Sequence, residues 1–211
     1  METYNNGVLG DFSGQVGPVI GSHWRGINVL QAIPNKISKA LRSADQLERD
    51  KFKFMLQFLS PIKGLLTETF SATGNKTPFD NAMSYHLKEA VSYTGTAFEI
   101  DYSKVLIGMG GLSGIAHSMV HGAGTTALTL AWLNNSQQGL AYPTDALLVV
   151  AYAPRLNDFD FFMAYNMREA GTSALDFMEI FHGETVHLWA TFTNIDLALT
   201  ATSRYLGSYV V

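Results

Sequence analysis

Two segments in the first half of the chain carry apolar residues at the spacing of an α-helix. In the first, Leu47, Met55 and Phe58 recur close to a period of 3.6 residues. Ser43 precedes this run as a candidate N-cap, and Pro61 follows it as a residue that ends or bends a helix. The pattern predicts an amphipathic helix between these two residues.

The second helical segment has a clearer start. Thr77 is a favourable N-cap, Pro78 suits the first helical position, and Asp80 places a negative charge in the first turn. Met83 and Leu87 then fall on one helical face. We expect both helices to cover an apolar surface elsewhere in the protein.

From about residue 97 the period changes to two, which is typical of half-buried strands. The run at 185–192 alternates most clearly. The predicted strands are 97–101, 103–110, 125–133, 145–153, 158–164, 173–181, 185–193 and 200–210. Short strands with turn residues between them and no intervening helix predict an antiparallel, immunoglobulin-like β-sandwich.

The first 36 residues have a different character, because glycine recurs among β-branched residues. This spacing favours an extended arm with tight turns. The sequence therefore predicts an α+β, mainly β, protein in three parts. These are a glycine-rich arm (1–36), two helices docked on the sandwich (37–95) and the sandwich itself (96–211).

Composition fits this picture and narrows the protein class. A hydrophobic fraction of 47% with 15% charged residues is typical of a globular protein. Cysteine is absent, which excludes disulfides, thiolate metal sites and cysteine nucleophiles. The first residues lack the pattern of a secretory signal, and the longest apolar stretch, 146–154, is half a membrane span at most. We expect no membrane contact and a protein that is cytoplasmic or released in a particle.

Charge is unevenly distributed along the chain. Residues 25–63 hold eight basic and three acidic side chains, a net charge of +5, whereas residues 138–211 hold three basic and eight acidic ones, a net charge of −5. Such asymmetry suits head-to-tail contact between copies of one chain, although two unrelated solvated surfaces would give the same numbers. The overall charge of −4 does not call for a nucleic-acid partner.

Several motifs resemble one bacterial family, common in the Bacteroidota and known only as a domain of unknown function. The N-terminal motif is Gly-x-x-Gly-x-x-x-Gly-x-x-Trp-Arg-Gly from Gly14 to Gly26, and further matches lie in 46–52, 98–106 and 205–207. The resemblance implies a fold and no chemistry. The helix start that carries Gln-x-x-Arg-x-x-Phe is also similar to segments of phage-type structural proteins.

Candidate catalytic groups are sparse. His117 and His121 could share a metal on a helix, but glycines around them disfavour a helix, and on a strand they would lie about 13 Å apart. Asp158 and Asp160 share a strand face, as a carboxylate pair for sugar hydrolysis would, although an edge strand with its polar side in water explains them more simply.

Two further motifs lack the neighbouring elements that a catalytic or nucleotide-binding site requires. Ser113 lacks the strand-to-helix turn of a nucleophile elbow, and the glycines at 108–111 are not followed by a phosphate-binding helix. We therefore predict a protein without catalytic activity, cofactor or metal.

The tryptophans allow a second hypothesis. Trp132 and Trp189 lie in strongly apolar strands and are predicted to belong to the core, whereas Trp24 lies in the glycine-rich arm and needs a surface to cover it. Ring platforms of this kind would also suit a monomeric binding module for glycans or for a surface protein.

The leading hypothesis is a structural protein that self-associates into a filament, tube or phage-like particle through its arm and its charged faces. The residues predicted to form the assembly interface are Gly17, Val19, Ile20, Trp24, Arg25, Arg42, Arg49 and Lys53.

Overall fold

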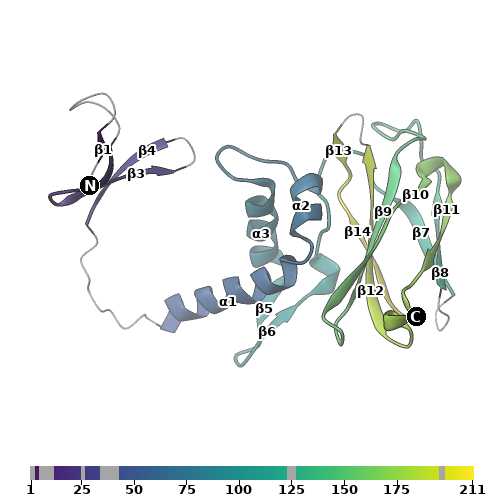
Figure 1. Ribbon diagram of the computed structural model, residues 1–211. Helices are drawn as coiled ribbons and strands as arrows, with labels where there is room; N and C mark the ends of the chain where they lie inside the picture. The colour runs from purple at the N-terminus through teal and green to yellow at the C-terminus, as the bar shows by residue number, and fades with distance from the viewer. Residues whose placement is uncertain (1–2, 5–11, 25–26, 34–42, 123–126, 195–197) are drawn as a thin grey trace. The chain divides into compact units, whose positions relative to one another are not determined.

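The computed structural model describes residues 3–4, 12–24, 27–33, 43–122, 127–194 and 198–211. The chain divides into two compact units, residues 1–46 and 47–211, and each is described by itself. Figure 1 traces both along the chain. Arg25 and Arg42, two of the predicted interface residues, lie outside the described residues.

The first unit is an antiparallel sheet in the strand order β1-β2-β3-β4. Its strands are β1 (Thr3–Tyr4), β2 (Phe12–Val16), β3 (Val19–Trp24) and β4 (Ile27–Ala32). Gly17 and Pro18 connect β2 to β3 in a two-residue turn, where Gly17 has a φ of +55°. Glycine at the first central position is what a type II′ hairpin turn requires. The described part of the glycine-rich segment is therefore extended, and its strands are paired with one another.

Three helices and a short hairpin open the second unit. The helices are α1 (Ser43–Leu59), α2 (Lys63–Thr69) and α3 (Pro78–Glu89), and the hairpin joins β5 (Val91–Tyr93) to β6 (Phe98–Ile100). The predicted start of α3 is confirmed: the Asp80 backbone N–H donates to Thr77 Oγ1 at 3.1 Å, and the Thr77 N–H donates to Asp80 Oδ2 at 2.9 Å. Helix α2 and strand β5 were not predicted.

The remaining strands form the predicted antiparallel sandwich (Figure 1). One sheet has the order β11-β8-β7 and the other the order β10-β9-β12-β14, with β13 also paired to β12. The strands are β7 (Ala116–His121), β8 (Ala127–Leu133), β9 (Ala146–Ala153), β10 (Asp158–Met167), β11 (Thr172–Asp176), β12 (Thr185–Asn194), β13 (Leu199–Thr200) and β14 (Arg204–Val210).

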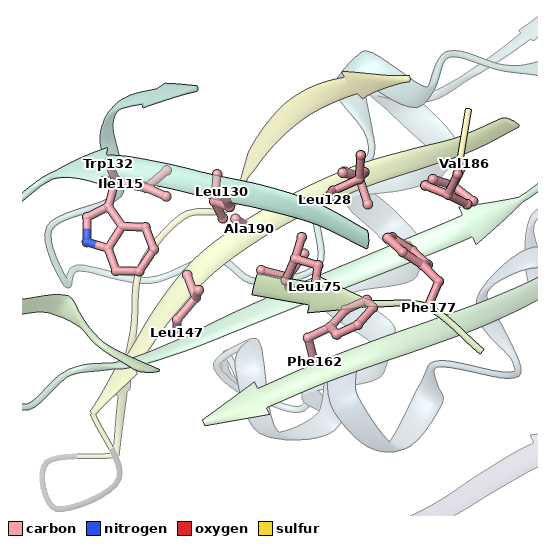
Figure 2. Close-up of a cluster of buried hydrophobic side chains, with 14 of the residues drawn as sticks. Ile115, Leu128, Leu130, Trp132, Leu147, Phe162, Leu175, Phe177, Val186 and Ala190 are labelled. Atoms are coloured by element: carbon pink, nitrogen blue, oxygen red, sulfur yellow. The ribbon is translucent and has the colours of Figure 1, made fainter. Parts of the chain in front are cut away.

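Two apolar cores hold the second unit together. The first fills the space between the two sheets, where side chains such as Leu130, Phe162 and Leu175 meet (Figure 2). The second lies on the opposite face of the larger sheet. There, helical residues such as Phe58, Leu66 and Met83 pack against strand residues that include Val150 and Trp189. The amphipathic helices thus bury their apolar faces on the sheet. Among the described residues, no helix is both long and apolar enough to cross a membrane.

The predicted strand 103–110 is wrong. Residues Tyr102–Lys104 form a 3₁₀ turn (η2), and the irregular segment that follows passes close to Thr200. A Cβ at Gly108 would lie 2.9 Å from Thr200 Cγ2, and one at Gly110 would collide with the Thr200 carbonyl oxygen. The glycines are therefore required for close approach of two backbones, which alternation along one segment cannot reveal.

Two other boundaries also changed. Strand β7 occupies residues 116–121, where no strand was predicted, and the predicted strand 173–181 ends at Asp176. A short 3₁₀ turn, η4 (Glu179–Phe181), follows it. Phe181 is buried and Ile180 is exposed, so burial alternates in this turn as it does in a strand. This explains why the sequence pattern extended the predicted strand to residue 181.

Candidate functional site

The predicted interface residues that the structure describes belong to both units. Gly17 is exposed at the β2–β3 turn, and Val19 and Ile20 are neighbours on β3, so they lie on opposite faces of the N-terminal sheet. The Trp24 backbone pairs with Ile27 at the end of the same hairpin. The list of predicted residues is completed by two exposed basic residues on α1, Arg49 and Lys53.

The N-terminal sheet exposes apolar side chains. Among its described residues Gly21 alone is buried, Val19 and Ile20 are half-buried, and Leu30 is 67% and Val16 38% exposed. A small sheet normally needs an apolar face packed against something to be stable in water. The N-terminal sheet therefore exposes apolar side chains and lacks a packed core among its described residues.

The second unit contains a pocket of about 970 Å³ that the sequence did not predict. Helix α1, the β5–β6 hairpin, η2 and the loop between β9 and β10 form its walls. We call it the aromatic pocket. Its lining residues are Phe54, Gln57, Phe58, Ser60, Pro61, Phe98, Glu99, Ile100, Tyr102, Tyr152, Pro154 and Asn157.

The rings of the aromatic pocket are in mutual contact. The centroid of Phe58 lies 5.0 Å from that of Tyr152 and 6.3 Å from that of Tyr102, and Phe54 lies 5.9 Å from Phe98. Edge-to-face and tilted pairs at these distances are favourable and hold the rings in place. The pocket thus has an aromatic wall in which rings from residues nearly a hundred positions apart in the sequence pack together.

The polar groups of the pocket are also positioned. The Tyr152 hydroxyl donates to Asn157 Oδ1 at 2.9 Å, and Asn157 has a φ of +53°, which asparagine tolerates better than most residues. The Tyr102 carbonyl oxygen accepts from Trp189 Nε1 at 3.0 Å, and the Tyr102 ring stacks on His187 with centroids 3.9 Å apart. Buried strand β12 therefore fixes the turn that carries Tyr102.

A buried ion pair at one end of the sandwich is structural. Arg168 Nε donates to Asp145 Oδ2 at 2.9 Å, and both side chains are fully buried. Arg168 also donates to Asn135 Oδ1 and to the Ser113 carbonyl oxygen, each at 2.6 Å, and its guanidinium lies 4.0 Å from the centroid of the Phe192 ring. Burial lowers the pKa of Arg168. These contacts are all to groups of the protein itself, and the fully buried guanidinium is not accessible to a ligand.

The histidines are dispersed. His117 and His121 are exposed on β7, and no group of three potential metal ligands occurs among the described residues. His86 is fully buried: its Nδ1 bonds to the Ala82 carbonyl oxygen at 2.7 Å, and its Nε2 accepts from the Leu106 N–H at 3.1 Å. Burial lowers the pKa of His86, so it is a neutral link between α3 and the following segment.

The two carboxylates of β10 differ in exposure, whereas the sequence predicted that both would face water. Asp158 is exposed, but Asp160 is only 8% exposed, so the polar side of this strand does not simply face water. Asp160 Oδ1 accepts from the Phe161 N–H at 2.9 Å, whereas its Oδ2 is buried without a partner. Burial raises the pKa of Asp160, and the negative charge of Asp158 adds to the effect.

This geometry makes a stability prediction. A raised pKa means that the folded protein binds the Asp160 proton more tightly than the unfolded chain does, so the energetic cost of the carboxylate is present at neutral pH and fades as the pH falls toward about 4. We expect Asp160→Asn to raise the free energy of unfolding at pH 7 by about 1 kcal/mol. Urea denaturation at pH 7 and near pH 4 measures the difference.

Asp176→Asn is the control, because Asp176 is exposed on β11 and its replacement removes the same single charge away from Asp160. It should change stability by less than about 0.5 kcal/mol. An Asp160→Asn gain that is the same at both pH values would contradict the proposed electrostatic cause.

The other candidate motifs serve the fold. Ser113 Oγ donates to the Gln138 carbonyl oxygen at 3.1 Å. Trp132 and Trp189 are 6% and 0% exposed, which confirms that they belong to the core. Sequence reasoning placed Phe58 on the apolar face of α1, but it had no signal that Phe58 would meet Tyr102 and Tyr152 in a pocket.

Strand order, antiparallel pairing and the core between the sheets define the second unit as an immunoglobulin-like β-sandwich with a helical layer on its larger sheet. The chain belongs to the family of unknown function DUF6266, whose model matches residues 11–207. The predicted bacterial group and family motif stay predictions.

No curated protein matches the chain. Among solved structures, the chain is similar to the fn3 domain of the human collagen alpha-1(XX) chain. The two are 18% identical, the match covers 49% of this chain and 88% of that one, and the TM-score is 0.31.

Proposed function

We propose that the protein is a non-enzymatic structural protein that joins further copies of itself into a larger assembly through its N-terminal sheet. One observation carries the proposal. The sheet exposes apolar residues and, among its described residues, buries Gly21 alone. Burial of such residues at a contact between chains supplies the main favourable free energy of association.

Charge supports a second copy as the partner. Residues 25–63, which include β4 and α1, carry a net charge of +5, and residues 138–211, which include most of the sandwich strands, carry −5. Within the sandwich, Asp158, Asp176 and Glu179 are exposed, so part of this negative charge is available at the surface. Complementary faces on one chain favour head-to-tail contacts, which extend into rings or filaments.

Leu30→Asp tests the proposal in the full chain. Leu30 is 67% exposed on β4, so aspartate costs the isolated chain little, but it would bury a charge at a contact made by this sheet. We expect the association constant to fall at least about tenfold. Light scattering and native mass spectrometry across a concentration series measure the shift toward the 23.1 kDa monomer.

Leu133→Asp is the control, because Leu133 is an apolar residue of β8 that is 54% exposed outside the N-terminal sheet. It should leave the mass distribution unchanged. A wild-type chain that stays monomeric up to about millimolar concentration would refute self-association. Assemblies that persist unchanged in Leu30→Asp would remove β4 from the interface.

A further inference from the structure

We propose that the aromatic pocket is a binding site for a neutral oligosaccharide, which the protein holds without hydrolysing it. The pocket has the size of a ligand site, at about 970 Å³, and lies within the second unit. The proposal does not depend on the N-terminal sheet, so it stands or falls separately from self-association.

The apolar part of the pocket suits sugar rings. A pyranose presents C–H groups on its faces and hydroxyls around its edge, so it packs an apolar face on an aromatic ring and keeps its polar edge free. Phe54, Phe98 and Tyr102 line the pocket and are each partly exposed, and their positions are fixed by contacts with neighbouring rings. A fixed aromatic surface loses little conformational entropy when a ligand binds.

The polar part of the pocket selects a polyol. Gln57, Ser60 and Asn157 are exposed at the pocket: Gln57 can donate and accept, whereas the Ser60 hydroxyl donates to the Leu56 carbonyl oxygen at 2.6 Å and is left to accept. Asn157 accepts the Tyr152 hydroxyl on its Oδ1, which leaves its Nδ2 to donate to a ligand. Glu99 only accepts, and therefore needs a ligand that donates. Sugar hydroxyls do both, whereas a proline-rich peptide has few donors to offer Glu99.

The charge of the pocket excludes anionic ligands and does not support hydrolysis. Among the described residues that line it, Glu99 is the single charged side chain, and no lysine, arginine or histidine is present to pair with a uronate or a phosphate. Glycoside hydrolysis ordinarily requires two carboxyl groups on opposite sides of the scissile bond. Asp101, close by in sequence, already binds Lys104 at 3.2 Å and the Ser103 hydroxyl. One carboxylate therefore supports binding alone.

Calorimetric titration of the full chain with maltohexaose, cellohexaose, laminarihexaose and xylohexaose tests the proposal, with decaproline as the competing probe. We expect at least one hexasaccharide to bind with a dissociation constant below about 1 mM, and decaproline not to bind. Glu99→Gln and Gln57→Ala change exposed side chains, so the fold should persist, and each should weaken that binding about five- to tenfold.

Glu48→Gln, a change at an exposed site of α1 that does not line the pocket, is the control and should leave the affinity within about twofold of wild type. Failure of all four sugars to bind at about 5 mM would overturn the proposal. Sugar binding that survives both pocket variants would move the site elsewhere, and preferential decaproline binding would assign the pocket to a peptide. Loss of the N-terminal contact in Leu30→Asp should not alter the titration.

Discussion

Replacement of Arg168 by methionine is expected to lower the free energy of unfolding by roughly 3–5 kcal/mol, a large share of the 5–15 kcal/mol that stabilises a typical domain. Arg168 and Asp145 are both fully buried, and the substitution leaves the Asp145 carboxylate without its cation. Methionine matches the apolar part of the side chain but removes the donors to Asn135 and to the Ser113 carbonyl oxygen. Urea denaturation at pH 7 measures the loss.

Lys104→Met is the matched control for this experiment. Lys104 pairs with Asp101 at 3.2 Å, but the two side chains are 56% and 41% exposed, so water solvates both partners when the pair is broken. The expected loss is below about 1 kcal/mol. Equal losses in the two variants would show that the Arg168 network contributes no more than a surface ion pair.

The contrast between these two pairs shows where sequence reasoning ends. In the charge count over residues 138–211, Asp145 was one of the eight acidic side chains and Arg168 one of the three basic ones. Nothing in the neighbouring sequence indicates that either side chain is buried. Asp145 precedes β9 and Arg168 follows β10, so the antiparallel pairing of these strands brings them together at one end of the sandwich. Only the register of the sheet creates this contact.

Local signals performed better. The N-cap of α3 at Thr77 and the existence of β12 were readable because the residues that signal each of them lie close together in the sequence. The irregular segment after η2 was misread as a strand because its glycines are required by Thr200, ninety residues away. Patterns within a few residues predict helices and strands, but they fail where a contact with a distant segment determines the local conformation.

The same distinction explains the candidate sites. The N-terminal sheet was recognisable as unusual because glycine spacing and charge are properties of the sequence itself. The aromatic pocket draws Phe54 from α1, Phe98 from β6 and Tyr152 from β9, and each is an ordinary apolar position in its own element. Their meeting depends on how the helical layer packs on the larger sheet.

Trp189→Ala should cost about 3–5 kcal/mol of folding free energy, because the indole is fully buried where the helical layer meets the larger sheet. It lies 5.6 Å from the Tyr205 ring and 6.3 Å from the Tyr102 ring, centroid to centroid. Truncation opens a cavity there and also removes the Nε1 donor to the Tyr102 carbonyl oxygen. Denaturant unfolding followed by circular dichroism measures the loss.

Trp189→Phe separates the two contributions. Phenylalanine keeps most of the apolar volume but cannot donate to Tyr102, so it should cost about 1–2 kcal/mol and leave the chain folded. If the bond positions Tyr102 for a ligand, the same variant should also weaken hexasaccharide binding. Trp132→Phe is the control, because Trp132 donates instead to the Arg168 carbonyl oxygen in the other core. Trp132→Phe is expected to lower stability by a comparable amount without weakening hexasaccharide binding. Equal weakening of binding in Trp132→Phe and Trp189→Phe would show that Trp189 does not position Tyr102.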